Sequence, residues 1–154
     1  MIERTITERG PSVVGRGYGF GLLLVLGLFF FHLTVLFDVA GFLVSAQSSF
    51  EEYLGPRSAG IAIVMGCFVV LFIAHGAEAA AWALFLRWHR VLSSFSEGLY
   101  FSAATISALG YGDVVLARPW RQLGPMVAIA GVLKFGCSTA FLFVVMQQVW
   151  VQHL

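Results

Sequence analysis

Charged residues are scarce in this chain: nine lysines and arginines and eight aspartates and glutamates make up 11% of its 154 residues. A soluble domain carries roughly 25% charged residues, so this chain lacks the polar cover that a water-facing surface requires. The hydrophobic share is 59% and the mean hydropathy is +0.88. The composition therefore predicts an integral membrane protein made of a single domain.

Other features are missing as well. The formal net charge is only +1, so no basic field indicates nucleic-acid binding. The two cysteines, Cys67 and Cys137, lie in apolar segments, which predicts small buried side chains rather than a disulfide or a metal site. Nucleophile elbows, phosphate-binding loops and metal-ligand spacings do not occur. We therefore expect no enzyme, no cofactor and no soluble substrate.

Three apolar segments are present, at residues 17–44, 58–88 and 122–151. Each is long enough to cross a bilayer core, which requires about 20 helical residues. We expect a polar N-terminal tail over residues 1–16. We expect a loop over residues 45–57, where polar side chains and a Gly-Pro pair interrupt the apolar pattern. The predicted fold is all-α, with three transmembrane helices.

A fourth segment, residues 95–107, is too short and too mixed in polarity to cross a membrane. Ser96 is a candidate N-cap, and Glu97 lies near the positive end of the helix dipole. We expect a re-entrant half-helix here, followed by non-helical backbone over residues 108–115. Such backbone is tolerated at membrane depth only where it is buried in protein or lines water.

The sequence GYGD occupies residues 110–113, between the half-helix and the last apolar segment. Gly110 and Gly112 can adopt positive φ without a Cβ clash. Alternating backbone handedness turns successive carbonyl oxygens to one side, where they can replace the water shell of K+. We therefore expect K+ to be bound by backbone carbonyls alone, in a filter at residues 108–113 whose ion-binding residues are Ala108, Leu109, Gly110, Tyr111 and Gly112. The alternative is a tight turn between the helices of a membrane protein that is not a channel.

The order of membrane helix, half-helix, glycine-rich turn and membrane helix resembles the pore module of the potassium channel family. The sequence SALGYGD at residues 107–113 is similar to the family's TTVGYGD, and the resemblance covers roughly residues 59–150. It implies a homotetramer in the lipid bilayer that passes K+ down its gradient. The chain looks like small bacterial members with three segments, which implies a multi-pass protein of the inner cell membrane.

The resemblance also implies roles for the residues around the filter. Tyr111 packs outward against the half-helix and holds the ring open, and Asp113 braces the turn at the outer mouth. Ser107 and Thr105 support the filter. Ala108 stands where the family has a threonine whose hydroxyl helps to form the innermost ion site. Weaker binding is expected there, so a non-selective cation channel stays open as an alternative.

Lys134 departs from what a cation pore requires, because a ring of lysines facing the axis would repel cations. Either Lys134 turns away from the pore or conduction is restricted, and a non-conducting membrane protein that keeps the pore fold is the corresponding alternative. Glu78 is the expected partner of Lys134, since outer and inner helices of a pore module pack side by side. The pair acts as a gate or proton-sensitive latch, or it fixes helix register, and we favour the register role.

Two further residues of the long segments carry open alternatives. His75 shares a helix face with Glu78. His75 is interpreted as a packing residue or as a group that titrates near neutral pH. His75 and Glu78 together raise the alternative of a proton-coupled transporter. Gly131 is the nearest match to the family's gating hinge, with close helix packing as the other interpretation.

The expected orientation conflicts with the distribution of charge. The family's topology places seven arginines on the outside and only Arg57 on the inside, opposite to the positive-inside rule. Three explanations are open. The filter determines the orientation and the positive-inside rule fails, or the first segment does not span the membrane, or the module is inverted in the membrane. The seven are Arg4, Arg9, Arg16, Arg87, Arg90, Arg118 and Arg121.

Overall fold

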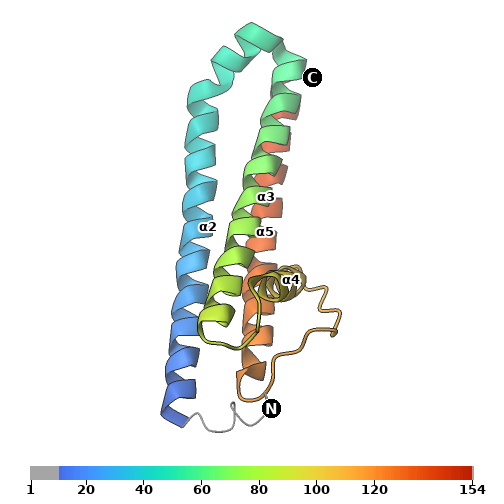
Figure 1. The fold of residues 1–154 in the computed structure, drawn as a ribbon. Coiled ribbons are helices and arrows are strands. Elements are labelled where there is room, and N and C mark those ends of the chain that lie inside the picture. The colour runs from blue at the N-terminus through green and yellow to red at the C-terminus, as the bar shows by residue number, and fades with distance from the viewer. Residues whose placement is uncertain (1–10, 154) are drawn as a thin grey trace. The chain divides into compact units, whose positions relative to one another are not determined.

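A computed structural model describes residues 11–153, and this part of the chain contains helices and no strand. Figure 1 shows the long helices, the short helix α4 and the loop that returns from it. The elements are α2 (Pro11–Leu54), α3 (Pro56–Trp88), α4 (Phe95–Ile106), the 3-10 helix η1 (Trp120–Gln122) and α5 (Leu123–His153).

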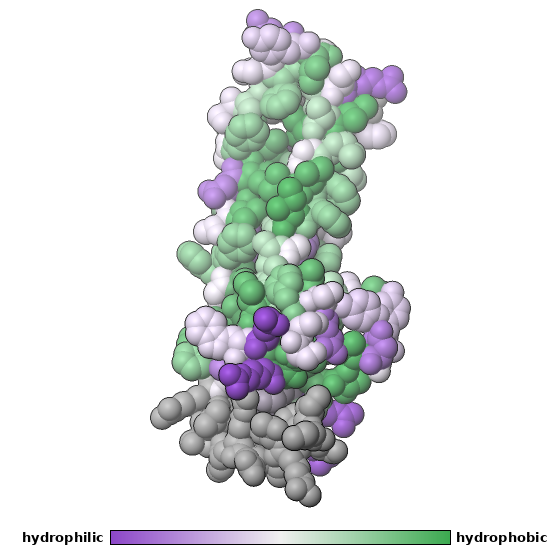
Figure 2. Space-filling view, viewed as in Figure 1, coloured by the Kyte–Doolittle hydropathy of each residue, from purple (hydrophilic) through white to green (hydrophobic). Residues whose placement is uncertain are grey.

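Within residues 11–153, three stretches are long and apolar enough to cross a membrane: residues 17–46, 56–88 and 120–151. Large hydrophobic side chains are exposed along them, including Phe37 at 75%, Phe72 at 70% and Trp150 at 69%. Figure 2 shows hydrophobic residues covering much of the visible surface of the long helices. Exposed apolar area of this kind suits acyl chains rather than water. The predicted all-α fold with three membrane helices is confirmed.

The loop expected at residues 45–57 is wrong, because α2 continues to Leu54. Only Gly55 interrupts the helices: its φ is 74°, and its N–H donates to the carbonyl oxygen of Glu51 at 3.0 Å. A glycine in the left-handed region ends a helix, and proline at the next position suits the first turn of α3. Polar side chains alone do not break a helix, so the segment before Gly55 stays helical.

The half-helix has a different cap from the one expected. Ser94, not Ser96, is the N-cap of α4, and its hydroxyl accepts from the N–H of Glu97 at 3.1 Å. Ser94 has extended backbone, with φ −129° and ψ 155°, and this conformation turns its side chain toward the first turn. At the other end of the chain, residues 1–10 of the expected polar tail lie outside the described residues, and residues 11–16 belong to α2.

The chain divides into two compact units, and each long helix contributes to both. The first unit comprises residues up to 29 and residues 77–133, with α4, the loop after it and η1. The second unit comprises residues 30–76 and the chain from residue 134 onward. Buried residues of the first unit form two clusters, one of Leu86, Phe101, Leu116, Trp120 and Leu123, and one of Ala79, Trp82, Ile106 and Val127. The second unit has a cluster of Ile63, Cys67 and Val145.

Two glycines let the backbones of the first unit approach closely around α4. A Cβ on Gly98 would lie 3.2 Å from backbone atoms of Ala83 on α3. A Cβ on Gly131 would lie 2.2 Å from the carbonyl oxygen of Ile106, at the end of α4. These two contacts fix α4 between α3 and α5, and so they position the loop that follows α4.

Candidate functional site

The loop that carries GYGD begins with a left-handed step out of α4. Ala108 has φ 59°, and its N–H donates to the carbonyl oxygen of Thr105 at 3.0 Å. The N–H of Gly110 reaches back to the carbonyl oxygen of Ala104 at 3.1 Å. A left-handed residue just after the C-cap, with N–H groups bonded back to the last turn, is a common way to end a helix. Glycine usually takes this position, because a Cβ there costs about 1–2 kcal/mol.

Left-handed residues then alternate along the loop. Gly110 has φ 49° and Gly112 has φ 80°, as expected of these glycines, and Ala108 adds a third positive φ that the sequence did not predict. All residues from 107 to 113 are exposed. The loop therefore presents a run of accessible backbone in which every second residue has reversed handedness.

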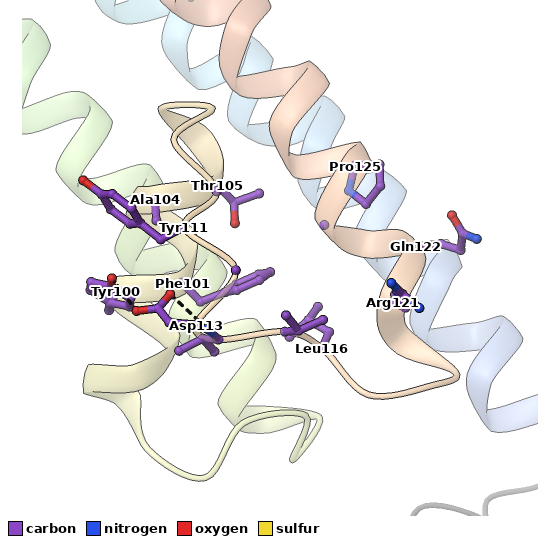
Figure 3. Close-up of a pocket in the computed structure, with 15 residues that line it drawn as sticks. Tyr100, Phe101, Ala104, Thr105, Tyr111, Asp113, Leu116, Arg121, Gln122 and Pro125 are labelled. Atoms are coloured by element: carbon purple, nitrogen blue, oxygen red, sulfur yellow. Dashed lines mark hydrogen bonds between the residues drawn. The ribbon is translucent and has the colours of Figure 1, made fainter.

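Asp113 and Tyr111 are both tied to α4 through Tyr100. The hydroxyl of Tyr100 donates to Asp113 Oδ2 at 2.7 Å, and Asp113 Oδ1 accepts from the N–H of Val114 at 3.0 Å (Figure 3). The ring of Tyr111 stacks on that of Tyr100, with centroids 6.5 Å apart and an interplanar angle of 15°. The outer end of the loop is thus attached to the half-helix by one hydrogen bond and one ring contact.

The Tyr100–Asp113 hydrogen bond shifts the titration of both partners. It holds the pKa of the Asp113 carboxyl below its ordinary value, and it raises the pKa of the Tyr100 phenol above its ordinary value. A charged acceptor and a neutral donor therefore face each other throughout the neutral pH range. Sequence reasoning missed this role of Tyr100, for which the only signal is a phenol on the half-helix before the motif.

An open cavity of about 290 Å³ lies between α4, the loop and the beginning of α5, all within the first unit (Figure 3). Thr105 and Ala104 line it from α4, Pro125 lines it from α5, and Arg121 adds a cation. Thr105, expected to support the filter, thus faces space behind the loop. Ser107, the other expected support, is exposed, and its hydroxyl donates to the carbonyl oxygen of Ala103 at 2.8 Å.

The returning half of the loop is anchored by Trp120, which is 3% exposed. The N-terminal part of α2 contributes to this anchor: the hydroxyl of Tyr18 donates to the carbonyl oxygen of Pro119, and the rings of Tyr18 and Trp120 are 5.9 Å apart. A Cβ on Gly17 would meet the Trp120 ring at 2.0 Å, so only glycine fits there. The first apolar segment therefore helps to hold the loop, a role that the sequence did not reveal.

Two charged residues of the long helices are buried within the single chain. Glu78 is 0% exposed and Lys134 is 1% exposed. They belong to different units, and the Glu78–Lys134 pair stays a prediction. In the second unit, His75 and His32 both lie within hydrogen-bonding distance of Ser138. The sequence indicated His75 as a polar residue of α3, and it did not indicate that His32 and Ser138 would accompany it.

Gly131, expected as a hinge or a packing residue, lies where α5 passes the end of α4. Its 2.2 Å approach to Ile106 matches the packing interpretation. Of the other polar groups of α4, Ser102 is fully buried, and its hydroxyl has no hydrogen-bond partner within the described part of the chain.

A family model described as ion channel matches residues 61–148. This stretch contains most of α3, all of α4, the GYGD loop and most of α5, and it exceeds half of the chain. No curated protein and no solved structure matches the chain. The matched residues are those that build and hold the exposed loop between two membrane-length helices, and the chain belongs to the ion channel family.

Proposed function

We propose that this protein is a potassium-selective channel, in which four copies of the chain surround an axis and the backbone of residues 108–112 binds K+. The observation that carries the proposal is the alternation of positive φ at Ala108, Gly110 and Gly112 in an exposed loop. Reversed handedness at every second residue allows successive carbonyl groups to face one side. One chain supplies one side of such a site, so the site requires several copies.

The exposure of the loop agrees with assembly. Leu109 is 60% exposed and Tyr111 is 67% exposed in the single chain, although both are large and apolar or aromatic. Large side chains of this kind can be covered by lipid or by protein, and the proposal assigns these two to contacts between copies. Neighbouring copies would cover them, and the Tyr100–Tyr111 stack would then be compressed between subunits.

The burial of Lys134 favours conduction over the non-conducting alternative. An ammonium group that is 1% exposed within one chain does not lie on a surface that an axis between copies could use. The electrostatic barrier that a ring of exposed lysines would create is therefore not expected. The non-selective alternative has its own support, since Ala108 lacks a hydroxyl for an inner ion site.

Ion flux through purified protein in liposomes tests the proposal. We expect flux driven by a K+ gradient to exceed flux driven by an equal Na+ gradient. Gly112→Ala should abolish it, because a Cβ is strained at φ 80°. Gly66→Ala is the matched control, since Gly66 is exposed on α3 and no described heavy atom lies within 4 Å of its added Cβ.

Each possible result has a distinct meaning. Equal K+ and Na+ flux would replace the selective channel by the non-selective one. Flux that persists in Gly112→Ala would show that the loop does not bind the ion. No flux in the parent protein would leave membership of the ion channel family intact and would contradict the proposed conduction.

A further inference from the structure

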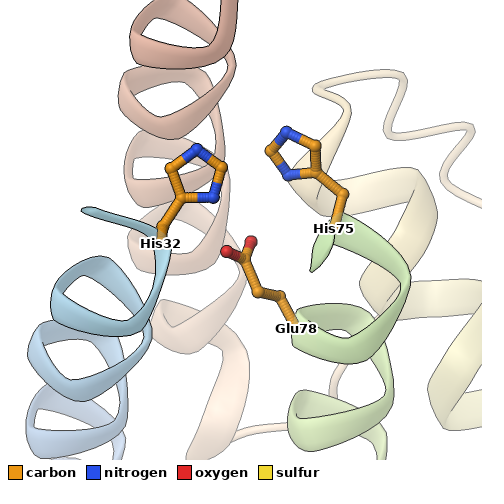
Figure 4. Close-up of side chains that lie close together, drawn as sticks. All are labelled: His32, His75 and Glu78. Carbon is orange, nitrogen blue, oxygen red and sulfur yellow. The ribbon is translucent and has the colours of Figure 1, made fainter. Parts of the chain in front are cut away.

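We propose that His32 and His75 form a binding site for a divalent transition-metal ion of the zinc class, inside the second unit. Nε2 of His32, on α2, lies 2.9 Å from Ser138 Oγ on α5. Nε2 of His75, on α3, lies 3.1 Å from the same oxygen. The two ring centroids are 4.9 Å apart (Figure 4). Two imidazole nitrogens from different helices therefore converge on one point.

This convergence suits zinc coordination. Neutral imidazole is the commonest protein ligand for metals and binds zinc, copper and nickel well. Ligand nitrogens of the two histidines lie within 4.8 Å of each other. Two nitrogens on one tetrahedral zinc ion are about 3.4 Å apart, from bonds of about 2.0–2.1 Å. Metal binding therefore requires the two rings to move closer together, and the Ser138 hydroxyl either moves aside or becomes a ligand.

A carboxylate is available on the same helix face as one of the histidines. Glu78 follows His75 by three residues on α3, the spacing that places two side chains on one face of a helix (Figure 4). It is 0% exposed. Two neutral imidazoles leave the charge of a dication uncompensated in an apolar segment, whereas an added carboxylate halves it. Glu78 thus places a carboxylate one helical turn from His75, and the ligands of the proposed site are the two histidines.

The surroundings restrict the histidine rings. The ring of His75 stacks on Phe135 with centroids 4.2 Å apart and an interplanar angle of 14°. His32 is 0% exposed and Ser138 is 5% exposed, so packing holds both. His75 is half-buried. Packing that limits ring rotation reduces the ordering cost of metal binding.

One charge opposes the site. Lys134 precedes Ser138 by four residues on α5, which places the two side chains on one helix face, and Lys134 is buried. A buried ammonium group one turn away disfavours a dication. The site therefore makes an unusual prediction: removing this lysine should strengthen metal binding.

Equilibrium dialysis of untagged protein in detergent micelles, against Zn2+ and separately against Co2+, tests the proposal. We expect one ion per chain, and Co2+ absorption bands of a nitrogen- and oxygen-ligated site. His32→Gln and His75→Gln should each weaken binding roughly tenfold or more. His89→Gln is the matched control, because His89 lies in the first unit, and it should bind as the parent does. Lys134→Met should bind more tightly than the parent.

Two results would overturn the proposal: no saturable binding by the parent, or unchanged binding in the His32→Gln/His75→Gln double variant. The parent measurement requires no substitution, so a variant that fails to fold does not leave the question open. The proposal does not rest on ion conduction, and its readout is metal binding rather than flux. Failure of the proposed channel function and failure of this site are therefore distinguishable.

Discussion

At the scale of single residues, Ala108 is the position where sequence and backbone conformation disagree most. An L-residue with φ 59° is strained, and glycine relieves the strain. Ala108→Gly should therefore raise the free energy of unfolding by roughly 1 kcal/mol. Ala108→Thr, which restores the family's hydroxyl, should lower it, because a β-branched side chain is poorly tolerated at positive φ. Thermal unfolding in detergent measures both changes.

Ala103→Gly provides the control for this comparison. Ala103 is exposed on α4, five residues earlier, and the same substitution in a helix interior costs about 1 kcal/mol. Opposite signs at the two alanines would support the left-handed conformation of Ala108. If Ala108→Thr is as stable as the parent, the backbone at residue 108 is not left-handed. A threonine hydroxyl at this position could then contribute to an inner ion site.

A second residue-scale prediction concerns acid. The Tyr100 hydrogen bond lowers the pKa of Asp113 in the folded protein, so the bond stabilises the fold above the ordinary aspartate pKa and is lost as pH falls through the lowered value. Tyr100 has a raised pKa, so its share is complete below the ordinary tyrosine pKa and is lost as pH rises through the raised value. Tyr100→Phe should therefore lower stability near neutral pH.

The measurement is the unfolding temperature of the parent and of Tyr100→Phe as a function of pH. The difference between them should stay constant through the neutral range and disappear at a pH low enough to protonate Asp113. Tyr53→Phe is the control, since Tyr53 is 86% exposed near the end of α2. A difference that persists when Asp113 is protonated would mean that the effect of the hydroxyl does not depend on the charge of Asp113.

At the scale of elements, the packing of α5 against the end of α4 rests on Gly131. A Cβ there would lie 2.2 Å from the carbonyl oxygen and 2.7 Å from the Cα of Ile106, and backbone atoms cannot move aside cheaply. Gly131→Ala should therefore destabilise the protein by roughly 1–3 kcal/mol.

Gly136→Ala, on the same helix, serves as the control. No described heavy atom lies within 4 Å of its added Cβ, so it should gain up to about 1 kcal/mol of helix propensity. Thermal unfolding of the two variants decides between the interpretations of Gly131. Unchanged stability in Gly131→Ala, with altered channel opening, would favour the hinge.

The helices differ in how far the sequence predicts them. Long apolar runs predict the three membrane helices, because every backbone group in a bilayer must bond within its own helix. The end of α2 is less predictable, since only Gly55 and not the polar run before it stops the helix. The N-cap of α4 is ambiguous in the sequence because serine occurs at 93, 94 and 96.

In the candidate site, too, some features are predictable from the sequence and others are not. The positive φ of Gly110 and Gly112 is predictable from the sequence, because glycine adopts positive φ freely. The conformation of Ala108 follows from how α4 ends, and no local signal marks it. The approach of His32 to Ser138 joins residues 106 positions apart, so only the packing of α2 and α5 reveals it.

At the scale of the whole molecule, the charge distribution and the family's topology still disagree. The segment at residues 17–46 is long and apolar enough to span, which removes support from the explanation that the first segment does not cross. Either the family's topology holds against the positive-inside rule, or the module is inverted. We expect the family's topology, with the GYGD loop on the outer side.

Cysteine labelling of intact cells tests this orientation in a variant that lacks Cys67 and Cys137. Ala117→Cys marks the loop after GYGD, and Tyr53→Cys marks the end of α2, before α3; both positions are exposed. Spans that cross place these two positions on opposite sides of the membrane. A membrane-impermeant thiol reagent should label Ala117→Cys directly and Tyr53→Cys only after permeabilisation. The reverse pattern would mean that the arginines determine the orientation and that the GYGD loop faces the cell interior.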